Sequence, residues 1–479
     1  MKTSIQHFSE KGIPQLQEMI KDFIKNPAYL AQFAENVRKI VLELGCSIIS
    51  ETLDECNLML ENSVKRRIHW QIKDRTQRTL LTSLGTIRFT HTRFTNKKTK
   101  ERAYLLDRLL ELPAHTRLSV DARAMLLEEA AQSSYRKAGE CLSEPVSKET
   151  VMRTVHRLNF PERKREQEEK KRKVKRLYVE ADEDHIALQF HEKKGDVKRW
   201  KGHGDNGRIV KLIYVHEGIE QKGKRNVLKN PVYFGGFCPG EKNKELWKEV
   251  DGYIKGQYEQ KSLEEIRFQS DGGGWMKEGA EKLGATFVLD GFHLRKYVKR
   301  LCRLTGKEEK EEEILGWIKE NKRKCLEEWS EEEGKRLGEK ERKKQEEACG
   351  YLKRNWKGIQ ERIKEKEGNI GSSTEAHISH VLSSRMSSRP MGWSKRGAKN
   401  LSRLRIYWKN GGDMKELLVR KEEGEKKPEE CVCLSAQEVL DWERRSQKRN
   451  GKYWERIQAS ISRQTGVRAY FQSAITGLC

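Results

Sequence analysis

The segment LYVEADEDHIALQ, residues 177–189, begins with apolar residues and then becomes acidic. Successive residues of a strand point to opposite faces, so Glu180, Asp182 and Asp184 are expected to share one face. Three carboxylates on one face repel one another unless cations or hydrogen bonds compensate them, which favours a divalent metal site. The alternative is a strand end whose acids lie in water, and this segment alone does not decide between the two.

The segments that follow this strand predict a mixed α and β domain. Strand-like runs occupy residues 210–215, 232–237, 266–269 and 286–289, with helical patterns at residues 245–254 and before Gly284. Consecutive strands followed by an alternation of strand and helix are typical of an α/β or α+β fold. We therefore expect a mixed sheet flanked by helices.

A second acid closes one of these strands in SDGGGW, residues 270–275. The glycines allow a tight turn into a helix, which would leave the carboxylate of Asp271 exposed and aimed outward. A phosphate-binding loop is disfavoured, because no Lys-Ser or Lys-Thr pair follows the glycines. The next strand ends in LDGFH, residues 289–293, where Asp290 and His293 are close enough in sequence to frame the same pocket.

A third acid, Glu375, follows the small-residue loop GSST at residues 371–374 and opens a helix. A carboxylate on a helix can reach across to metal ions held by strands. Glutamate in a first helical turn also complements the helix dipole, and local chemistry does not choose between these two roles.

The first 160 residues predict three successive regions. They are a helical region at residues 1–75, a small basic strand region at residues 76–118 and a helix-turn-helix-like region at residues 119–160. In the third region, Ser147 is a good N-cap for a helix that directs Lys148, Arg153 and Arg157 outward, as a DNA recognition helix does. An ordinary helical hairpin with basic solvent faces is the alternative.

The rest of the chain predicts one mixed domain that is interrupted by an insertion. The regions are a charged linker at residues 161–176, the first part of the domain at 177–305, an all-helical insertion at 306–370, the second part at 371–425 and a C-terminal region at 426–479. The insertion is rich in Glu and Lys between regularly spaced apolar residues, so we interpret its charges as solvated helix faces with no catalytic role.

The overall charge indicates the kind of partner. Lys and Arg number 98 against 73 Asp and Glu, a formal net charge of +25, which favours a nucleic acid or an anionic membrane. The sequence has neither a run of about 18 apolar residues nor a secretion signal, so we expect a soluble cytoplasmic protein without a membrane partner. The ten cysteines are scattered, so we expect neither disulfides nor structural zinc.

Four segments resemble the DDE transposases with a ribonuclease-H-like core, most closely the bacterial insertion-sequence transposases of the ISLre group. They are LYVEADEDHIALQ at 177–189, SDGGGWMKEG at 270–279, LDGFHLRKYVKR at 289–300 and SSTEAHISHVLSSRMSSRPMGWS at 372–394. The resemblance covers nearly the whole chain. It implies a ribonuclease-H-like mixed sheet and metal-dependent cleavage of transposon ends, followed by strand transfer into target DNA, in a bacterial protein associated with the nucleoid.

The resemblance also implies residue roles. Asp182, Asp271 and Glu375 match the three catalytic acids, which would hold Mg²⁺ or Mn²⁺, as two ions. Asp290 and His293 match a D-x-x-H segment of Mutator-like relatives and would support the site. The implied partners are double-stranded DNA, both terminal inverted repeats and target, and further copies of the chain in a homo-oligomeric DNA complex.

Two residues on the same strand, Asp182 and Asp184, are candidates for the first catalytic acid. Asp182 is preferred to Asp184 because the earlier residue of a core strand lies deeper. The sequence itself leaves both candidates in place, with Asp184 as a supporting residue.

Basic residues near these segments are candidate phosphate contacts. They are Lys296, Lys299, Arg300, Arg385, Arg389, Lys395 and Arg396. Cations spaced along helices and loops can follow a DNA backbone, although general surface basicity would give the same pattern. Two other functions stay open: a non-catalytic DNA-binding regulator, and a structure-selective nuclease on the same core fold.

Overall fold

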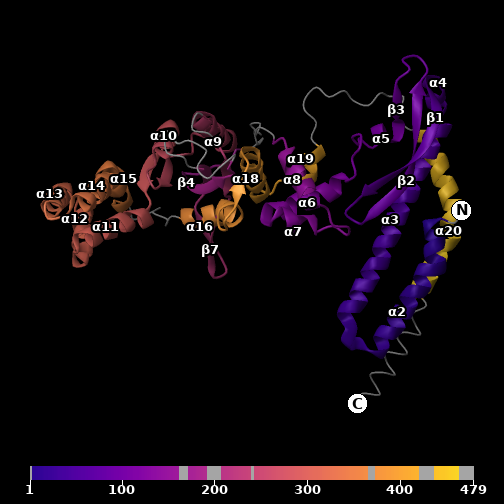
Figure 1. Cartoon of the computed structure of the whole chain (residues 1–479), viewed down its shortest axis with the longest axis horizontal. Coiled ribbons are helices and arrows are strands. Elements are labelled where there is room, and N and C mark those ends of the chain that lie inside the picture. The colour runs from indigo at the N-terminus through magenta and orange to yellow at the C-terminus, as the bar shows by residue number, and fades with distance from the viewer. Residues whose placement is uncertain are drawn as a thin grey trace. The chain divides into compact units, whose positions relative to one another are not determined.

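The computed structural model describes residues 3–160, 171–190, 206–238, 242–364, 373–419 and 436–462 (Figure 1). The chain divides into two compact units. Unit 1 comprises Met1–Glu129, Tyr135–Val151 and Met414–Cys479, and unit 2 comprises Ala130–Ser134 and Met152–Asp413. Separate clusters of buried apolar residues lie in each unit, so each has its own core.

Unit 1 combines helices with a small antiparallel sheet. Its helical segments are α1 (Ser4–His7), η1 (Phe8–Gly12), α2 (Ile13–Lys25), η2 (Pro27–Tyr29), α3 (Leu30–Asn62), α4 (Val64–His69), α5 (Leu105–Leu109), α7 (Tyr135–Gly139), α19 (Met414–Val419) and α20 (Ala436–Ser462), with α6 (Val120–Gln132) and α8 (Lys148–His156) beginning there. Its strands are β1 (Trp70–Leu81), β2 (Thr86–Asn96) and β3 (Arg102–Tyr104), in the order β1-β2-β3.

Gly85 lies in the turn of the β1–β2 hairpin, where Leu81 pairs with Thr86. Strand β1 begins at Trp70, inside the region that the sequence predicted to be helical. The middle of β1 is polar on both faces, so its period of two is not visible in the sequence.

Strand β3 pairs only with Arg93–Thr95 of β2, and helix α3 covers the preceding part of β2 with a row of polar side chains. The acceptors Ser50, Asp54 and Asn57 take hydrogen bonds from the backbone N–H groups of Arg88, Thr90 and Thr92, at 3.3, 2.6 and 2.9 Å. Spacings of four and three residues put the acceptors on one stripe of the helix, and alternate residues of a strand edge present their N–H groups in one direction. This cover removes an edge that could otherwise pair with another chain.

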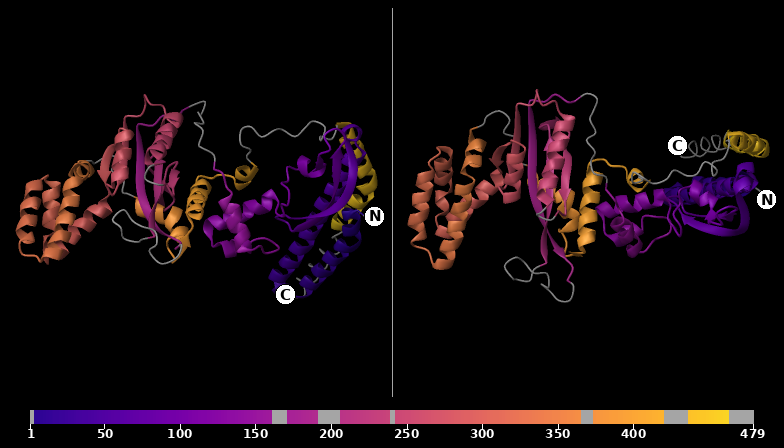
Figure 2. Two further views of the ribbon diagram at one scale, coloured as in Figure 1. Left: turned by 45° about the horizontal axis from the view of Figure 1, so that its top comes forward. Right: turned by 90° about the horizontal axis from the view of Figure 1, so that it is seen from above.

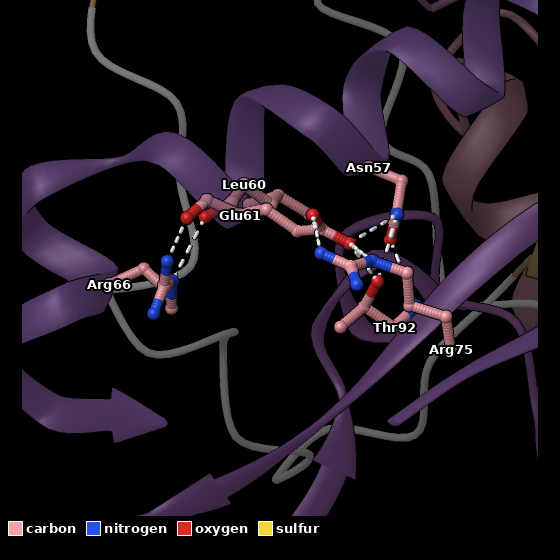
Figure 3. Close-up of polar contacts among 6 residues, drawn as sticks. All are labelled: Asn57, Leu60, Glu61, Arg66, Arg75 and Thr92. Atoms are coloured by element: carbon pink, nitrogen blue, oxygen red, sulfur yellow. Dashed lines mark hydrogen bonds and ion pairs between the residues drawn. The ribbon is translucent and has the colours of Figure 1, made fainter. Parts of the chain in front are cut away.

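Glu61 extends this stripe and ties the end of α3 to the sheet (Figure 3). Its carboxylate accepts two hydrogen bonds from Arg75 on β1, at 2.9 and 2.8 Å, and others from Asn57 and Thr92. The hydrogen bond from Arg75 lowers the pKa of Glu61, and burial acts in the opposite direction. The carboxylate is therefore ionised at neutral pH and fixes the helix on the hairpin.

Unit 2 contains the mixed sheet and most of the remaining helices. Its strands are β4 (Arg176–Leu188), β5 (Gly207–His216), β6 (Ile219–Lys222), β7 (Arg225–Leu228), β8 (Val232–Gly236), β9 (Glu265–Ser270), β10 (Thr286–Leu289) and β11 (Gly392–Trp393). Its helical segments are α9 (Asn243–Gln257), α10 (Gly274–Lys282), α11 (Gly291–Thr305), η4 (Glu308–Lys310), α12 (Glu311–Lys319), α13 (Arg323–Gly334), α14 (Glu339–Arg354), α15 (Trp356–Ile363), α16 (Thr374–Ile378), η5 (Ser379–Ser383), α17 (Ser384–Met386) and α18 (Lys395–Lys409).

The main sheet has the strand order β10-β9-β4-β5-β8, and β11 pairs with the end of β4. Strands β4, β9 and β10 are parallel, whereas β5 is antiparallel to both β4 and β8. Helix α9 connects β8 to β9, and α10 connects β9 to β10. The expected mixed sheet with flanking helices is confirmed, and each of the four predicted strand runs overlaps a strand.

Helices cover both faces of this sheet. On one face, apolar residues of β4, β5 and β9 pack with Trp247 and Val250 of α9 and with Met276 of α10. On the other face, α16 lies against β4, and Figure 1 shows α9 and α16 on opposite sides of that strand. The carboxyl end of β4 is thus enclosed by segments that are far apart in the sequence.

The predicted helical insertion forms a second apolar cluster of unit 2. Residues of α12, α13, α14 and α15 pack with α11 and with Leu289 at the end of β10. Figure 2 shows these helices, in orange tones, packed side by side. The insertion is therefore continuous with the edge of the sheet. No helix in the described ranges is long and apolar enough to cross a membrane.

Candidate acidic site

Strand β4 carries its acids on the face opposite the α9–α10 cluster. Val179 and Ala181 are buried in that cluster, so the alternate residues Glu180, Asp182 and Asp184 face the other way. The shared face predicted from the alternation is present. Strand β9 ends at Ser270, whereas β4 continues to Leu188, so Asp182 and Asp184 extend past the end of their parallel neighbour.

Glu180 is fully buried and acts as an anchor between three segments. Its Oε1 lies 3.2 Å from Nε2 of His216 on β5. The backbone N–H of Ser373, just before α16, donates to its Oε2 at 3.2 Å, and the Ser373 hydroxyl donates to its Oε1 at 3.4 Å. Glu180 thus holds the start of α16 on the face of β4.

Asp182 and Asp184 differ in what they contact. The hydroxyl of Ser387 lies 2.8 and 2.9 Å from the two carboxylate oxygens of Asp184. Asp182 accepts the backbone N–H of its own neighbour Glu183 at 2.8 Å. Asp184 therefore holds a segment that is distant in the sequence.

Asp271 directly follows the last residue of β9. The last pair of the β4–β9 register joins Glu180 to Gln269, and two residues further along each segment are Asp182 and Asp271. The turn is shaped by Gly272, whose φ of 84° favours glycine, and the N–H of Gly273 donates to Oδ1 of Asp271 at 2.9 Å. Parallel strands with this register bring the two acids to one edge of the sheet.

Asp290 and His293 follow the next parallel strand. Asp290 caps α11, and its Oδ2 lies 3.3 Å from the backbone nitrogen and 3.1 Å from Nδ1 of His293. Burial raises the pKa of Asp290, but the hydrogen bonds from His293 outweigh it and lower the pKa overall. The hydrogen bond to Asp290 raises the pKa of His293 against the effect of burial, and the charge of Asp271 adds to the increase.

Helix α16 carries Glu375 and is fixed by aromatic side chains of β5 and β8. The hydroxyl of Tyr214 lies 3.0 Å from that of Ser373, and the hydroxyl of Tyr233 lies 2.8 Å from Nδ1 of His377. Burial raises the pKa of Tyr233 to about 12, so it remains a hydroxyl donor. Helix α16, which carries Glu375, therefore begins beside Glu180. The side chain of Glu375 lies outside the described part of the chain.

The donor types at this edge suit the metal that the sequence resemblance implies. Carboxylate oxygens are the ligands that Mg²⁺ prefers, and Asp182 and Asp271 supply them from adjacent strands. Among the described side chains, no group of three or more His, Cys, Asp or Glu residues lies close enough to hold a metal ion. A complete site would thus need the carboxylate of Glu375 as well.

The helical insertion contacts the Asp271 turn, which the sequence did not indicate. The Tyr351 hydroxyl donates to the backbone carbonyl of Asp271, and its ring stacks on Tyr297 of α11 with centroids 3.7 Å apart. A Cβ at Gly272 would lie 2.5 Å from Oδ1 of Asn355. Helix α14 therefore supports the turn after β9 and the helix after β10 together. No local pattern in the sequence signals these long-range contacts.

Arg362 brings a partly buried cation to the end of β10. Its Nη1 donates to the carbonyl of Leu289 at 3.3 Å, and a Cβ at Gly291 would lie 2.5 Å from its Nη2. Burial lowers the pKa of Arg362, and the charges of Asp290 and Glu180 act in the opposite direction. Arg362 thus partly compensates the acids, and the sequence analysis missed it among the many charges of the insertion.

Helix α8 has the orientation predicted for its basic residues. Val151 and Val155 are buried, whereas Lys148, Arg153 and Arg157 are exposed. The hydroxyl of Ser147 accepts the backbone N–H of Thr150 at 3.3 Å, as expected of an N-cap. Lys148 lies 3.8 Å from the carboxylate of Glu149, its neighbour on the same exposed surface.

The other candidate phosphate contacts fall into three groups. Lys296, Arg389, Lys395 and Arg396 are exposed, Lys299 and Arg300 form ion pairs with Glu311 and Glu347 at 3.9 and 3.5 Å, and Arg385 is buried. Arg385 donates to the carbonyl of Ala130 at 3.2 Å and lies over the Trp393 ring. Its guanidinium serves internal packing here, which corrects its expected place on the surface.

Comparison with known proteins shows to which family this chain belongs. The model of the uncharacterised protein family UPF0236 matches residues 23–424. UPF0236 protein TTE2489 of Caldanaerobacter subterraneus subsp. tengcongensis is 35% identical over 406 residues, which are 84% of this chain and 84% of the relative. A UPF0236 protein of the same organism, whose name combines eleven designations from TTE0033 to TTE2212, is 36% identical over 84% of this chain and 83% of its own length.

A more distant relative comes from another organism. The UPF0236 protein in the vanSb 3′ region of Streptococcus gallolyticus is 24% identical over 293 residues, which are 58% of this chain and 60% of the relative. The match of the family model to most of the chain, together with relatives more than 30% identical, determines the assignment. This chain belongs to the uncharacterised protein family UPF0236.

Proposed function

We propose that this protein is a DDE-type DNA transposase, which cleaves transposon ends and joins them to target DNA through Asp182, Asp271 and Glu375. The observation that carries the proposal is the register of β4 and β9, in which Asp182 and Asp271 follow the last paired residues. The attachment of α16 to Glu180 supports the third position, because Ser373 is two residues from Glu375.

The sheet supports the fold that the sequence resemblance implies. Its strand order is β10-β9-β4-β5-β8, and β5 alone runs opposite to the other four strands. This arrangement agrees with a ribonuclease-H-like core. Asp271 and Asp290 follow the carboxyl ends of β9 and β10, where sites of open α/β sheets form, and Asp182 lies on β4 beyond its pairing with β9. The helices α12–α15 correspond to an insertion between the second and third acids.

The names of the relatives offer separate support for the proposal that the gene moves within a genome. One relative carries eleven designations in a single organism, and two others carry four and two. Several designations under one name are expected when one gene occupies several places in a genome. A gene that encodes its own transposase is expected to spread in this way.

The residues of the site have separable tasks. When bound, two divalent ions would activate the attacking oxygen and stabilise the departing oxygen of a phosphodiester. Asp182, Asp271 and Glu375 would hold them. Asp290 would orient His293 through their hydrogen bond. Lys296, exposed on α11 six residues after Asp290, would contact a phosphate. Further copies of the chain would hold the second transposon end.

The test uses full-length protein, Mg²⁺ and duplexes that carry the DNA flanking the gene. We expect cleavage and joining by the wild-type protein and a loss of about 100-fold or more in Asp182→Ala, Asp271→Ala and Glu375→Ala, with duplex binding retained. Glu264→Ala removes an acid that is 67% exposed and is the control. Full activity of all three variants would refute the site.

The same assay separates the other two functions. Cleavage without joining would assign a structure-selective nuclease on the same core. Duplex binding without cleavage in Mg²⁺ or Mn²⁺ would assign a non-catalytic regulator that uses α8 for recognition.

A further inference from the structure

Unit 1 carries an accumulation of positive charge that the acidic site does not use. Residues 64–100 contain eleven Lys and Arg and a single acid, Asp74. Six exposed basic side chains from this stretch form what we term the basic patch: Lys65, Arg67, His69, Lys97, Lys98 and Lys100. The first three belong to α4, and the others belong to the turn between β2 and β3.

Hydrogen bonds join these two segments into one surface. The backbone N–H of Lys97 donates to the carbonyl of His69 at 2.9 Å, and Nζ of Lys97 donates to the carbonyl of Arg67 at 2.6 Å. Trp70 pairs with Asn96, which continues the contact into the sheet. The cations of α4 therefore lie next to those of the turn.

The patch stands on rigid backbone. Oδ1 of Asn96 accepts the N–H groups of Lys98 and Thr99 at 2.9 and 3.0 Å, which fixes the turn. Under α4, the buried Arg66 donates to the carbonyls of Leu60 and Trp70, at 3.1 Å each (Figure 3 shows the contact with Leu60). Rigid support lowers the entropy that the patch would lose when it binds a ligand.

The acids near the patch are already neutralised. Glu61 pairs with Arg75 at 2.8 Å. Asp74 pairs with Arg93, and Glu101 pairs with Arg108. Among the described residues, the basic patch itself forms no ion pair. Its charge is therefore directed at something outside the protein.

We propose that the basic patch binds the phosphate backbone of duplex DNA, in addition to the candidate phosphate contacts named above. The choice of DNA rests on the proposed function. Lysines and arginines on fixed backbone hold a duplex through its phosphates without reading its sequence. The patch thus supplies affinity and leaves recognition to other parts of the chain.

The side chains of the patch favour a duplex over other polyanions. Single strands bind on exposed aromatic platforms, but the aromatic residues here, Trp70 and Phe94, are 1% and 0% exposed. A membrane-binding helix needs a long apolar face, whereas α4 has six residues and exposes only Val64 and Ile68 as large apolar side chains.

The experiment measures binding of full-length protein to a fluorescein-labelled duplex of arbitrary sequence by fluorescence anisotropy. EDTA is present throughout, so cleavage does not occur and the result is independent of the acidic site. The patch variant is Lys97→Gln/Lys98→Gln/Lys100→Gln. The control variant, Lys340→Gln/Lys343→Gln/Lys344→Gln, removes the same charge from exposed positions of α14.

We expect the patch variant to bind about 10-fold or more weakly at about 0.1 M KCl, with a slope of log K against log salt that is smaller by about two to three. The control should bind like the wild type. Lys65→Gln/Arg67→Gln, which leaves the turn intact, should weaken binding as well, and this distinguishes lost contacts from a misfolded turn.

Three results would overturn the inference. The first is unchanged duplex binding in both patch variants, and the second is an equal loss in the control. The third is that the patch variants keep duplex binding but lose binding to phosphatidylserine vesicles, because the surface would then serve a membrane. If the wild-type protein binds duplex through the patch but never cleaves it, only the proposed function fails.

Discussion

At the scale of single residues, His377 shows how burial acts on the attachment of α16. Its Nδ1 lies 2.8 Å from the Tyr233 hydroxyl, and its ring packs on Tyr214 with centroids 4.8 Å apart. Burial lowers the pKa of His377, and the charge of Glu180 acts against this shift. His216, His380 and Lys409 add further positive charge, so the folded state favours a neutral ring.

The expected consequence is acid sensitivity of unit 2. Because the folded pKa of His377 lies below the model-compound value of 6.5, the unfolded state takes up the proton first as the pH falls below 6.5. The free energy of unfolding should then decrease until the pH reaches the folded pKa. His377→Gln should reduce this decrease in denaturant titrations at several pH values.

The control for this prediction is His185→Gln, since the side chain of His185 is 73% exposed. Its pH profile should match that of the wild type. An identical acid sensitivity in the wild type and in His377→Gln would show that this ring does not couple folding to pH.

At the scale of elements, two glycines in helices allow the effect of close packing to be distinguished from the effect of helix propensity. A Cβ at Gly358 in α15 would lie 2.4 Å from the ring of Phe287 and 3.2 Å from the backbone nitrogen of Leu289. At Gly316 in α12, a Cβ would meet nothing within 4 Å. We expect Gly358→Ala to destabilise unit 2 by about 1–3 kcal/mol through overpacking.

The matched substitution Gly316→Ala should stabilise the same unit by about 0.5–1 kcal/mol, because alanine is the better helix former. Denaturant unfolding of both variants measures the two effects. If both substitutions stabilised the protein, α15 would not be tightly packed on β10.

At the scale of the whole molecule, two units with separate cores should lose stability separately. Phe89 is 0% exposed in the core of unit 1, and Phe268 is 0% exposed in the α9–α10 cluster of unit 2. We expect Phe89→Ala and Phe268→Ala each to cost about 3–5 kcal/mol in the unit concerned. Hydrogen exchange measured by mass spectrometry should then increase in β1–β3 for the first variant and in β4–β9 for the second.

A uniform increase in exchange across both units, produced by either substitution, would contradict this prediction and indicate one cooperative structure. Reporter peptides that lie within β2 and within β5 are sufficient for the comparison.

Much of the sheet of unit 2 follows from local pattern. Residues 210–215, 232–237, 266–269 and 286–289 were predicted as strands, and each run overlaps one. The start of β1 at Trp70 was missed because the strand is polar on both faces in its middle. Periodicity reports burial on one face, so a strand that buries neither face there gives no signal.

The sequence predicted the acids of the candidate site but not the residues that support them. Alternation along β4 put Asp182 and Asp184 on one face, and the structure shows that Asp184 binds Ser387. The insertion was interpreted as solvated helices, yet its Tyr351 and Arg362 contact the backbone at Asp271 and Leu289.

The amino-acid sequence by itself determined which residues alternate along β4, where charge accumulates and which loops carry glycine, because these depend on neighbours within a few positions. Only the tertiary structure decided that β9 pairs with β4 as far as Glu180 and Gln269, that Glu180 holds the start of α16 and that α3 covers part of β2. These contacts join residues 36 to 193 positions apart, and their energies arise only once the chain has brought them together.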